Sequence, residues 1–393
     1  MGARVVYLDH NATTPVDTRV LEAMWPWFTD QPGNAASRHH ASGRRAEAAV
    51  EKAREQVAGS VGGDPREVVW TSGATEANNL ALKGVMRSPV HASSRDHLVT
   101  VVTEHKAILD PTATLEAEGV RVTRLGVGTD GRVDLDQLSR VVDERTRLVS
   151  VMLANNETGV LQPIDEIARI TRAAGALLHT DATQALGRLP LRLDDTGVDL
   201  ASFSAHKSHG PKGVGALWLR RKGPRVRCVP LIEGGGHERG LRSGTLNVPG
   251  IVGFGRAAEL AHLEGPGDAG RMAGLRDRLE RGLIEIGGVT VNGAGAPRLP
   301  NTSSLAFEGV DAESLLRRLE SVEASTSAAC TSASLQPSYV LRAMGLDEAS
   351  ITGSVRLSLG RSTTREDIEI ALEELLVSIG LERTEGPTPS CEV

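Results

Sequence analysis

Short runs of apolar, β-prone residues alternate with helical stretches over the first 220 residues of the chain. The runs that predict strands are 67–72, 97–102, 147–153, 176–181, 199–204 and 215–220. The stretches that predict helices are 43–59, 75–86, 106–118, 134–143 and 163–174. Strands that are apolar throughout are buried on both faces, which is typical of a parallel sheet covered by crossover helices. The alternation therefore predicts an α/β fold with a mostly parallel central sheet.

The composition changes near residues 261–275, where the sequence AHLEGPGDAGRMAGL suggests a domain boundary. The elements predicted beyond it are a helix at 270–286, strands near 289–292 and 303–308, a helix at 311–319, the run SVRLSLG and a helix at 364–380. This pattern predicts a smaller α+β C-terminal domain at 262–380, after a large domain at 15–261. Residues 381–393 are expected to form a loose tail.

Charge and hydropathy exclude several classes of protein. The 393 residues carry a formal net charge of −6, which argues against a broad basic surface for nucleic acid. No apolar run reaches the roughly 20 residues of a membrane span, and the N-terminal sequence lacks a signal-peptide pattern, so the cytoplasm is the expected location. The three cysteines, Cys228, Cys330 and Cys391, are too few and too scattered for a disulfide framework or a zinc site.

Polar and small residues cluster where the predicted strands end. These residues are Ala74, Thr75, His105, Asn156, Asp181, Gln184, Ser204, His206 and Lys207. In open parallel sheets, ligands bind outside the carboxyl ends of the strands. We therefore expect these residues to converge on one site.

Lys207 is the residue that needs the most explanation, because a lysine at the end of a buried strand is costly unless it is paired, neutral or covalently bonded. The chain contains only 6 lysines against 38 arginines. Arginine cannot act as a nucleophile here, since its guanidinium does not deprotonate in proteins. Lys212 is the alternative, but it lies in a Gly-Pro loop, where an exposed or phosphate-facing lysine is expected.

The turn at Gly73 opens a predicted helix, and a helix N-terminus suits a phosphate through its free N–H groups and its dipole. Ser72 or Thr75 could instead cap this helix. Asp181 follows an apolar run, and a buried carboxylate there could be a cap, a core ion pair or the partner of a cationic ring nitrogen. Together with Lys207, which would form a Schiff base, these features describe a site for pyridoxal 5′-phosphate.

Eight motifs follow one another along the chain: YLDHNATTP, TSGATEANNLAL, TEHKAILD, NNETGVLQPI, HTDATQALG, SAHKSHGPKGVGALW, GGGHERGLRSGTLNVPGIVGFG and CTSASLQPSYVLRAMG. They extend from about residue 5 to residue 365, which is nearly the whole chain. In this order they resemble the cysteine desulfurases of the NifS/IscS type. The resemblance implies the fold of a fold-type I pyridoxal-phosphate-dependent transferase, and residues 1–14 are expected to join the smaller domain.

The resemblance also implies a role for each matched residue. Lys207 would carry the cofactor, and His105 would stack on the cofactor's ring. Asp181 would pair with the ring nitrogen, and Gln184 would contact the ring hydroxyl. The residues that would hold the phosphate are Ala74, Thr75, Ser204 and His206.

Two further roles concern the substrate and a second subunit. Asn156 lies within the implied cofactor site, and Asn156 and Arg356 would hold the substrate carboxylate, for which an arginine fork is suited. The resemblance implies a homodimer, in which Thr245 would reach the phosphate of the neighbouring subunit.

Cys330 lies in EASTSAACTSASLQPSYVL, where nearly every neighbour is small and little can be buried. The resemblance implies that Cys330 is the nucleophile, on a catalytic loop at 324–334. Cys330 would take sulfur from L-cysteine as a persulfide while L-alanine is released. No metal site is expected, apart from a transient iron–sulfur contact at Cys330.

The implied sulfur acceptor is another protein, either an iron–sulfur scaffold or an enzyme of tRNA or DNA thiolation. No direct contact with nucleic acid or membrane is expected. The alternatives are a selenocysteine lyase or another class V enzyme of the same fold. A docking subunit without catalysis is a further alternative, which an intact set of Lys207, His105 and Asp181 disfavours.

Overall fold

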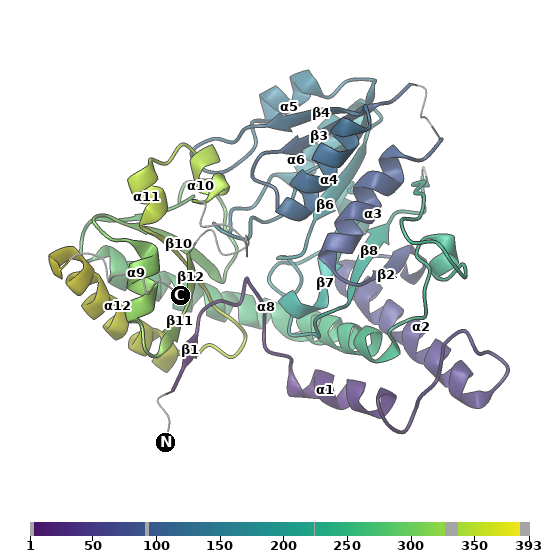
Figure 1. The fold of residues 1–393 in the computed structure, drawn as a ribbon, viewed down its shortest axis with the longest axis horizontal. Coiled ribbons are helices and arrows are strands. Elements are labelled where there is room, and N and C mark those ends of the chain that lie inside the picture. Colours follow the sequence, from purple (N-terminus) through teal and green to yellow (C-terminus); the bar gives the residue numbers. More distant parts are fainter. Residues whose placement is uncertain (1–3, 91–93, 224, 327–336, 386–393) are drawn as a thin grey trace.

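Two large sheets, a two-stranded sheet and one long helix organise the chain in the computed structural model, which describes residues 4–90, 94–223, 225–326 and 337–385 (Figure 1). The strands are β1 (Val6–Tyr7), β2 (Val68–Thr71), β3 (His97–Val101), β4 (Arg121–Leu125), β5 (Thr146–Ser150), β6 (Leu177–Asp181), β7 (Leu200–Ser204), β8 (Gly215–Leu219), β9 (Val289–Val291), β10 (Thr302–Phe307), β11 (Val322–Glu323), β12 (Ser325–Thr326) and β13 (Ser354–Ser358). The helices are α1 (Thr18–Met24), α2 (Ala41–Val61), α3 (Ala74–Met86), α4 (Lys106–Ala117), α5 (Leu135–Val141), α6 (Ile164–Ala173), α7 (Leu193–Thr196), α8 (Val248–Ile284), α9 (Ala312–Arg318), α10 (Tyr339–Ala343), α11 (Glu348–Thr352) and α12 (Arg365–Glu385).

The larger sheet has the strand order β2-β8-β7-β6-β5-β3-β4. Strands β7, β6, β5, β3 and β4 pair in parallel, whereas β8 runs antiparallel to both β2 and β7. The prediction of an α/β fold with a mostly parallel central sheet is therefore confirmed. The carboxyl ends of β2, β3, β5, β6 and β7 meet at one edge, because β2 points in the same direction as β7.

Successive residues of a strand point to opposite faces of the sheet, and each face has its own core. In β2, Val68 and Trp70 join the core that includes residues of α2, α6 and α8. Val69 joins the core formed with α3 and α4. Burial on both faces explains why these strands read as continuous apolar runs.

A smaller antiparallel sheet has the order β12-β13-β10-β9. Its core contains Leu305 and Leu357 from the sheet, Leu279 from α8 and Leu375 from α12. Strand β1 pairs with β11, and Asp9 bridges to the end of β13. Residues near the N-terminus therefore lie beside the C-terminal part of the chain, as Figure 1 shows.

Helix α8 runs through the expected boundary without a break, so the predicted helix start at 270 was wrong. Its first half contributes Ile251 and Phe254 to the core of the larger sheet, and its second half contributes Leu279 to the core of the smaller one. Packing at both ends outweighs the cost of Pro266, about 3 kcal/mol in a helix interior. A division of the chain at 261–262 remains a prediction.

The C-terminal helix is longer than predicted. Helix α12 continues to Glu385, into the segment expected to be a tail. Glu382 explains the extension, because it is buried and accepts hydrogen bonds from Ser314 Oγ and Arg318 Nε, each at 2.5 Å. Residues 386–393 lie outside the described residues. Among the helices in the described ranges, none has a stretch long and apolar enough to cross a membrane.

Candidate functional site

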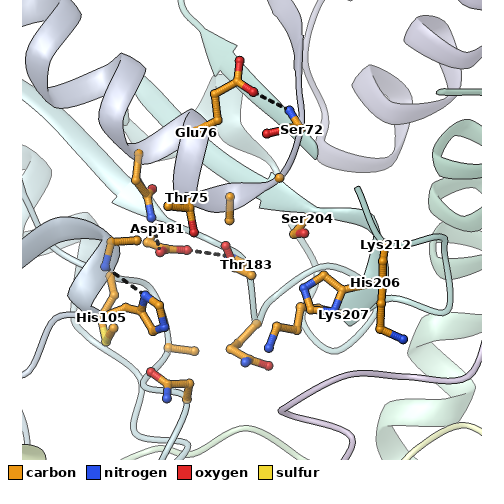
Figure 2. Close-up of a pocket in the computed structure, with 18 of the residues that line it drawn as sticks. Ser72, Thr75, Glu76, His105, Asp181, Thr183, Ser204, His206, Lys207 and Lys212 are labelled. Atoms are coloured by element: carbon orange, nitrogen blue, oxygen red, sulfur yellow. Dashed lines mark hydrogen bonds between the residues drawn. The ribbon is translucent and has the colours of Figure 1, made fainter. Parts of the chain in front are cut away.

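A cavity of about 410 Å³ lies at the carboxyl edge of the larger sheet (Figure 2). Its lining includes nine residues that the sequence predicted: Ala74, Thr75, His105, Asn156, Asp181, Gln184, Ser204, His206 and Lys207. They come from the ends of strands that are neighbours in the sheet or from the loops and helices that follow. The predicted convergence of strand-end residues is thus present in the structure.

Lys207 closes the short 3-10 turn that follows β7. Its Nζ donates to the carbonyl oxygens of Asn11 at 2.6 Å and Ala12 at 2.7 Å. In Figure 2, Lys207 and His206 lie on one side of the cavity, and Asp181 and His105 lie on the other. The backbone of the N-terminal segment therefore fixes where the amine stands.

The N-terminus of α3 faces the cavity with Gly73 as its N-cap, and no side chain caps it. The backbone N–H of Ser72 donates to Glu76 instead, so capping by Ser72 or Thr75 is not what the structure shows. A Cβ added at Gly73 would meet only Ser204 Oγ, at 3.8 Å, which leaves room for a ligand. Uncapped N–H groups, the helix dipole and a nearby hydroxyl fit a phosphate.

His206 lies beside this turn in the same cavity. Burial, followed by the charges of Lys207 and Lys212, lowers the pKa of His206 to about 4. Its Nδ1 lies 3.1 Å from Thr13 Oγ1. A neutral imidazole of this kind can donate one hydrogen bond to an anion. Lys212 also lines the cavity, from an exposed position.

Asp181 is buried, with 7% of its surface exposed, and each carboxylate oxygen accepts one hydrogen bond. Asn78 Nδ2 donates to Oδ2 at 2.7 Å, and the backbone N–H of Thr183 donates to Oδ1 at 3.0 Å. An anion held in this way inside a cavity fits a cationic ring nitrogen.

His105 is the N-cap of α4, where its Nδ1 accepts a hydrogen bond from the N–H of Ala107 at 3.0 Å. A neutral ring in this arrangement carries its proton on Nε2. The preceding Glu104 is fully buried and accepts from the N–H of Met152 at 2.6 Å. Burial, and to a smaller degree Asp181, raises the pKa of Glu104 well above its usual value.

Two predicted residues within the described ranges, Arg356 and Thr245, do not line the cavity. Arg356 is fully buried and pairs with Asp9 Oδ1 at 2.6 Å, although it also reaches the backbone oxygen of Asn156, a cavity residue, at 3.1 Å. Thr245 is exposed in the loop before α8. Cys330 lies outside the described residues.

Two residues of the site were not predicted from the sequence. Asn78, one turn into α3, orients Asp181. Thr183 lines the cavity, and its buried Oγ1 has no hydrogen-bond partner among the residues that the structure describes. The motifs TEANN and HTDATQ contain both, but nothing in them distinguishes these side chains from their neighbours. An unpartnered buried hydroxyl, the Asp181 carboxylate and the open α3 N-terminus together fit pyridoxal phosphate.

The sequence predicted no metal site apart from a transient iron–sulfur contact at Cys330. In the part of the chain that the structure describes, no group of three or more His, Cys, Asp or Glu side chains could hold a metal ion. A contact at Cys330 lies outside that part.

Comparisons with known proteins extend over nearly the whole chain. The aminotransferase class-V family matches residues 6–371. The chain is 57% identical over 365 residues to the cysteine desulfurase IscS of Anaeromyxobacter sp. (strain Fw109-5), covering 93% of this chain and 90% of that relative. A solved NifS-like protein is 40% identical with a TM-score of 0.88, covering 96% of this chain and 100% of the other. The crystal structure of DndA from Streptomyces lividans is 41% identical with a TM-score of 0.76, covering 88% and 97%.

Proposed function

Because the chain belongs to the aminotransferase class-V family and is a pyridoxal-phosphate-dependent cysteine desulfurase, we propose that Lys207 holds the cofactor and Cys330 accepts the sulfur. The observation that supports this proposal best is the convergence of three unlike groups in one cavity. These groups are the amine of Lys207, the buried carboxylate of Asp181 and a helix N-terminus without a side-chain cap. The reaction converts L-cysteine to L-alanine.

Each of these groups matches one part of the cofactor. When bound, pyridoxal phosphate supplies an aldehyde that takes up an amine and a pyridine ring that accepts electrons. Lys207 would hold the aldehyde, and Asp181 would hold the ring nitrogen in its protonated form. The N-terminus of α3, Ser204 and His206 would hold the phosphate. Gln184 would contact the ring hydroxyl.

Lys207 is also placed to move a proton. Its amine lies in the cavity and is anchored by the carbonyls of Asn11 and Ala12. Once the amine has given up its proton, it can accept the α-proton of the bound amino acid and return it to the product. His105 would cover one face of the ring, since it lines the cavity from the start of α4.

The sulfur transfer conserves atoms and electrons. The thiolate of Cys330 attacks the sulfur of the bound cysteine, so an S–S bond forms while the C–S bond breaks. The electron pair of the broken bond remains on the substrate carbon, which takes up a proton. The products are L-alanine and a persulfide on Cys330, and a covalent carrier of this kind divides one difficult transfer into two easier ones. No external oxidant is required.

Asn156 and Arg356 would recognise the substrate's carboxylate. Arg356 donates to Asn156 from a fully buried position, and its Nε has no partner in the described ranges. A carboxylate is the acceptor that best matches unused guanidinium donors.

The proposal extends to a second subunit, to the protein that accepts the sulfur and to the location in the cell. Thr245 would complete the site of a second copy in a homodimer. The persulfide would pass to an iron–sulfur scaffold or to an enzyme of tRNA or DNA thiolation. The proposed location of the protein is the cytoplasm, which cell fractionation tests. A selenocysteine lyase remains the alternative, and the relative rates with L-cysteine and L-selenocysteine separate the two.

Four variants test the assignment. Lys207→Ala should lose the cofactor's visible absorption and all activity, whereas Lys212→Ala, the matched control, should keep the absorption. Cys330→Ala should keep the absorption but release neither alanine nor sulfide, and Cys228→Ala should be active. A colourless wild type after reconstitution with pyridoxal phosphate, or an active Cys330→Ala variant, contradicts the proposal.

A further inference from the structure

Arg188 is a buried cation that the reaction described above does not use. It lies in the turn between β6 and α7, with 7% of its surface exposed. Gly187, at φ 77°, turns the chain just before it, and a Cβ there would come within 3.0 Å of Ala261. The Arg188 guanidinium then points back toward the strand-end residues.

Every hydrogen-bond acceptor of Arg188 is neutral. The guanidinium donates to the carbonyl oxygens of His10 at 3.1 Å and Lys207 at 3.3 Å. It also donates to the carbonyl oxygen of Gln184 at 3.2 Å and to the side-chain oxygen of the same residue. The contacts with Lys207 and Gln184 place the charge directly behind two residues that line the cavity.

No carboxylate offsets this charge within the described ranges. The titratable and charged side chains around Arg188 are His10, Arg192, Lys207, His209, His262, Asp268, Arg356 and Arg361. The one acid in that set, Asp268, already pairs with Arg271 and Arg361, at 3.2 and 3.0 Å. Burial, and then the charge of Arg356, lowers the pKa of Arg188. An unpaired buried charge is expensive, so its presence calls for an anion that the protein binds.

The contact with Arg188 also decides how the amide of Gln184 is oriented. An arginine can only donate hydrogen bonds, so the atom of the Gln184 amide that faces Arg188 must be the oxygen. The amide nitrogen therefore faces the other way and donates to the carbonyl of Asn11 at 3.0 Å. The amide nitrogen carries a second N–H, so Gln184 can offer a donor to a ligand in the cavity that it lines.

We propose that Arg188 is a positioning residue that fixes Gln184 as a hydrogen-bond donor and, by its own charge, makes the site select the deprotonated ring oxygen of the pyridine cofactor. This inference rests on the proposed function, because it assumes that pyridoxal phosphate occupies the cavity. It adds a residue that touches neither cofactor nor substrate and acts through Gln184 and the turn at Lys207. The ligand class it implies at this point is an anionic aromatic oxygen.

The test measures the protonation of the bound cofactor. Reconstituted enzyme is titrated with base, and the pH midpoint of the cofactor's visible absorption band is recorded. Arg188→Met removes both the charge and the constraint on Gln184, so the midpoint should rise by about one pH unit, a tenfold change in proton affinity. Arg188→Lys keeps a positive charge but lacks the planar guanidinium that holds Gln184. Its midpoint should therefore lie between those of the wild type and of Arg188→Met. The affinity of the apoenzyme for pyridoxal phosphate should be highest for the wild type, lower for Arg188→Lys and lowest for Arg188→Met.

Arg192→Met is the matched control, because this nearby arginine has 77% of its side chain exposed and pairs with Asp195. Its midpoint should equal that of the wild type. If Arg188→Met does not fold, Gln184→Glu removes the donor while keeping the acceptor for Arg188, and its midpoint should also rise. A midpoint unchanged in Arg188→Met or in Gln184→Glu overturns the inference.

The two proposals fail in different ways. A wild type that gains no visible band with pyridoxal phosphate overturns both. A wild type whose band disappears in Lys207→Ala, but whose midpoint does not respond to Arg188→Met, overturns only the role of Arg188.

Discussion

Replacing Gly215 by alanine should weaken cofactor binding although residue 215 does not line the cavity. A Cβ at this position would lie 2.5 Å from the carbonyl oxygen of Phe203 and 2.6 Å from the Cα of Gly73, whereas such contacts essentially never fall below 3.0 Å. Either β8 or its neighbours must therefore move by at least about 0.5 Å. Phe203 precedes the turn that carries Lys207, and Gly73 is the N-cap of α3, so the displacement falls on both ends of the site.

The magnitude follows from the cost of overpacking a close-packed interior, about 1–3 kcal/mol. At 1.4 kcal/mol for each factor of ten, the unfolding equilibrium should shift about 5- to 150-fold toward the unfolded state. Urea denaturation of the apoprotein measures this change, and a fluorescence titration measures the affinity for pyridoxal phosphate. We expect at least tenfold weaker binding, since the phosphate turn is displaced on the order of half an ångström.

Gly59→Ala is the matched control. Gly59 lies in α2, and a Cβ there would meet no atom within 4 Å, so alanine should stabilise the helix by about 0.5–1 kcal/mol. Its affinity for the cofactor should not change. If Gly215→Ala is as stable as the wild type and binds the cofactor equally well, the close approach of β8 to the phosphate turn is not what positions the site.

Three further predictions concern single side chains. Asn78→Ala removes the 2.7 Å hydrogen bond to Asp181 and should weaken cofactor binding about tenfold, by the same fluorescence titration. Burial raises the pKa of Cys228 to about 12, so iodoacetamide at pH 8 should leave this thiol unmodified in the native protein, which peptide mass spectrometry checks. Burial lowers the pKa of His179 to about 4, so the unfolded chain binds more protons than the native one between pH 6.5 and 4. The free energy of unfolding should therefore fall as the pH is lowered through this window, and His179→Asn should make the fall shallower in urea denaturation.

The sequence predicted well those strands of the larger sheet that are buried on both faces, because such burial leaves a direct mark on composition. Val68, Val69 and Trp70 are all buried, so β2 is apolar throughout. Strand β4, Arg121–Leu125, carries two arginines at the edge of the sheet and was not predicted. Only Leu125 of this strand is buried, and its charged side chains interrupt the apolar run by which a strand is predicted. Helix α8 was predicted to start too late because Pro266 normally ends a helix, and only tertiary packing shows otherwise.

The residues of the site also fall into those that the sequence could predict and those that it could not. Side chains that follow buried strands, such as Asp181 and Lys207, stand out because a charge there breaks an apolar run. Asn78 and Arg188 do not stand out, since each acts through a partner brought close only by the fold, Asp181 for one and Gln184 for the other. No periodicity or spacing encodes such pairs. The predicted carboxylate ligand Arg356 shows the converse, because the structure gives it a partner, Asp9, that sequence reasoning did not supply.

The N-terminal motif YLDHNATTP shapes the site through atoms that its side chains do not reveal. The motif contributes to the site chiefly through its backbone: the carbonyls of Asn11 and Ala12 hold Lys207, which is 196 and 195 residues away in the sequence. Its first residues pair with the smaller sheet through β1, and Asp9 pairs with Arg356 of β13. One extended segment therefore connects the lysine amine to the strand that carries the predicted carboxylate ligand. Because backbone acceptors are present at every residue, only the fold can show which of them are used.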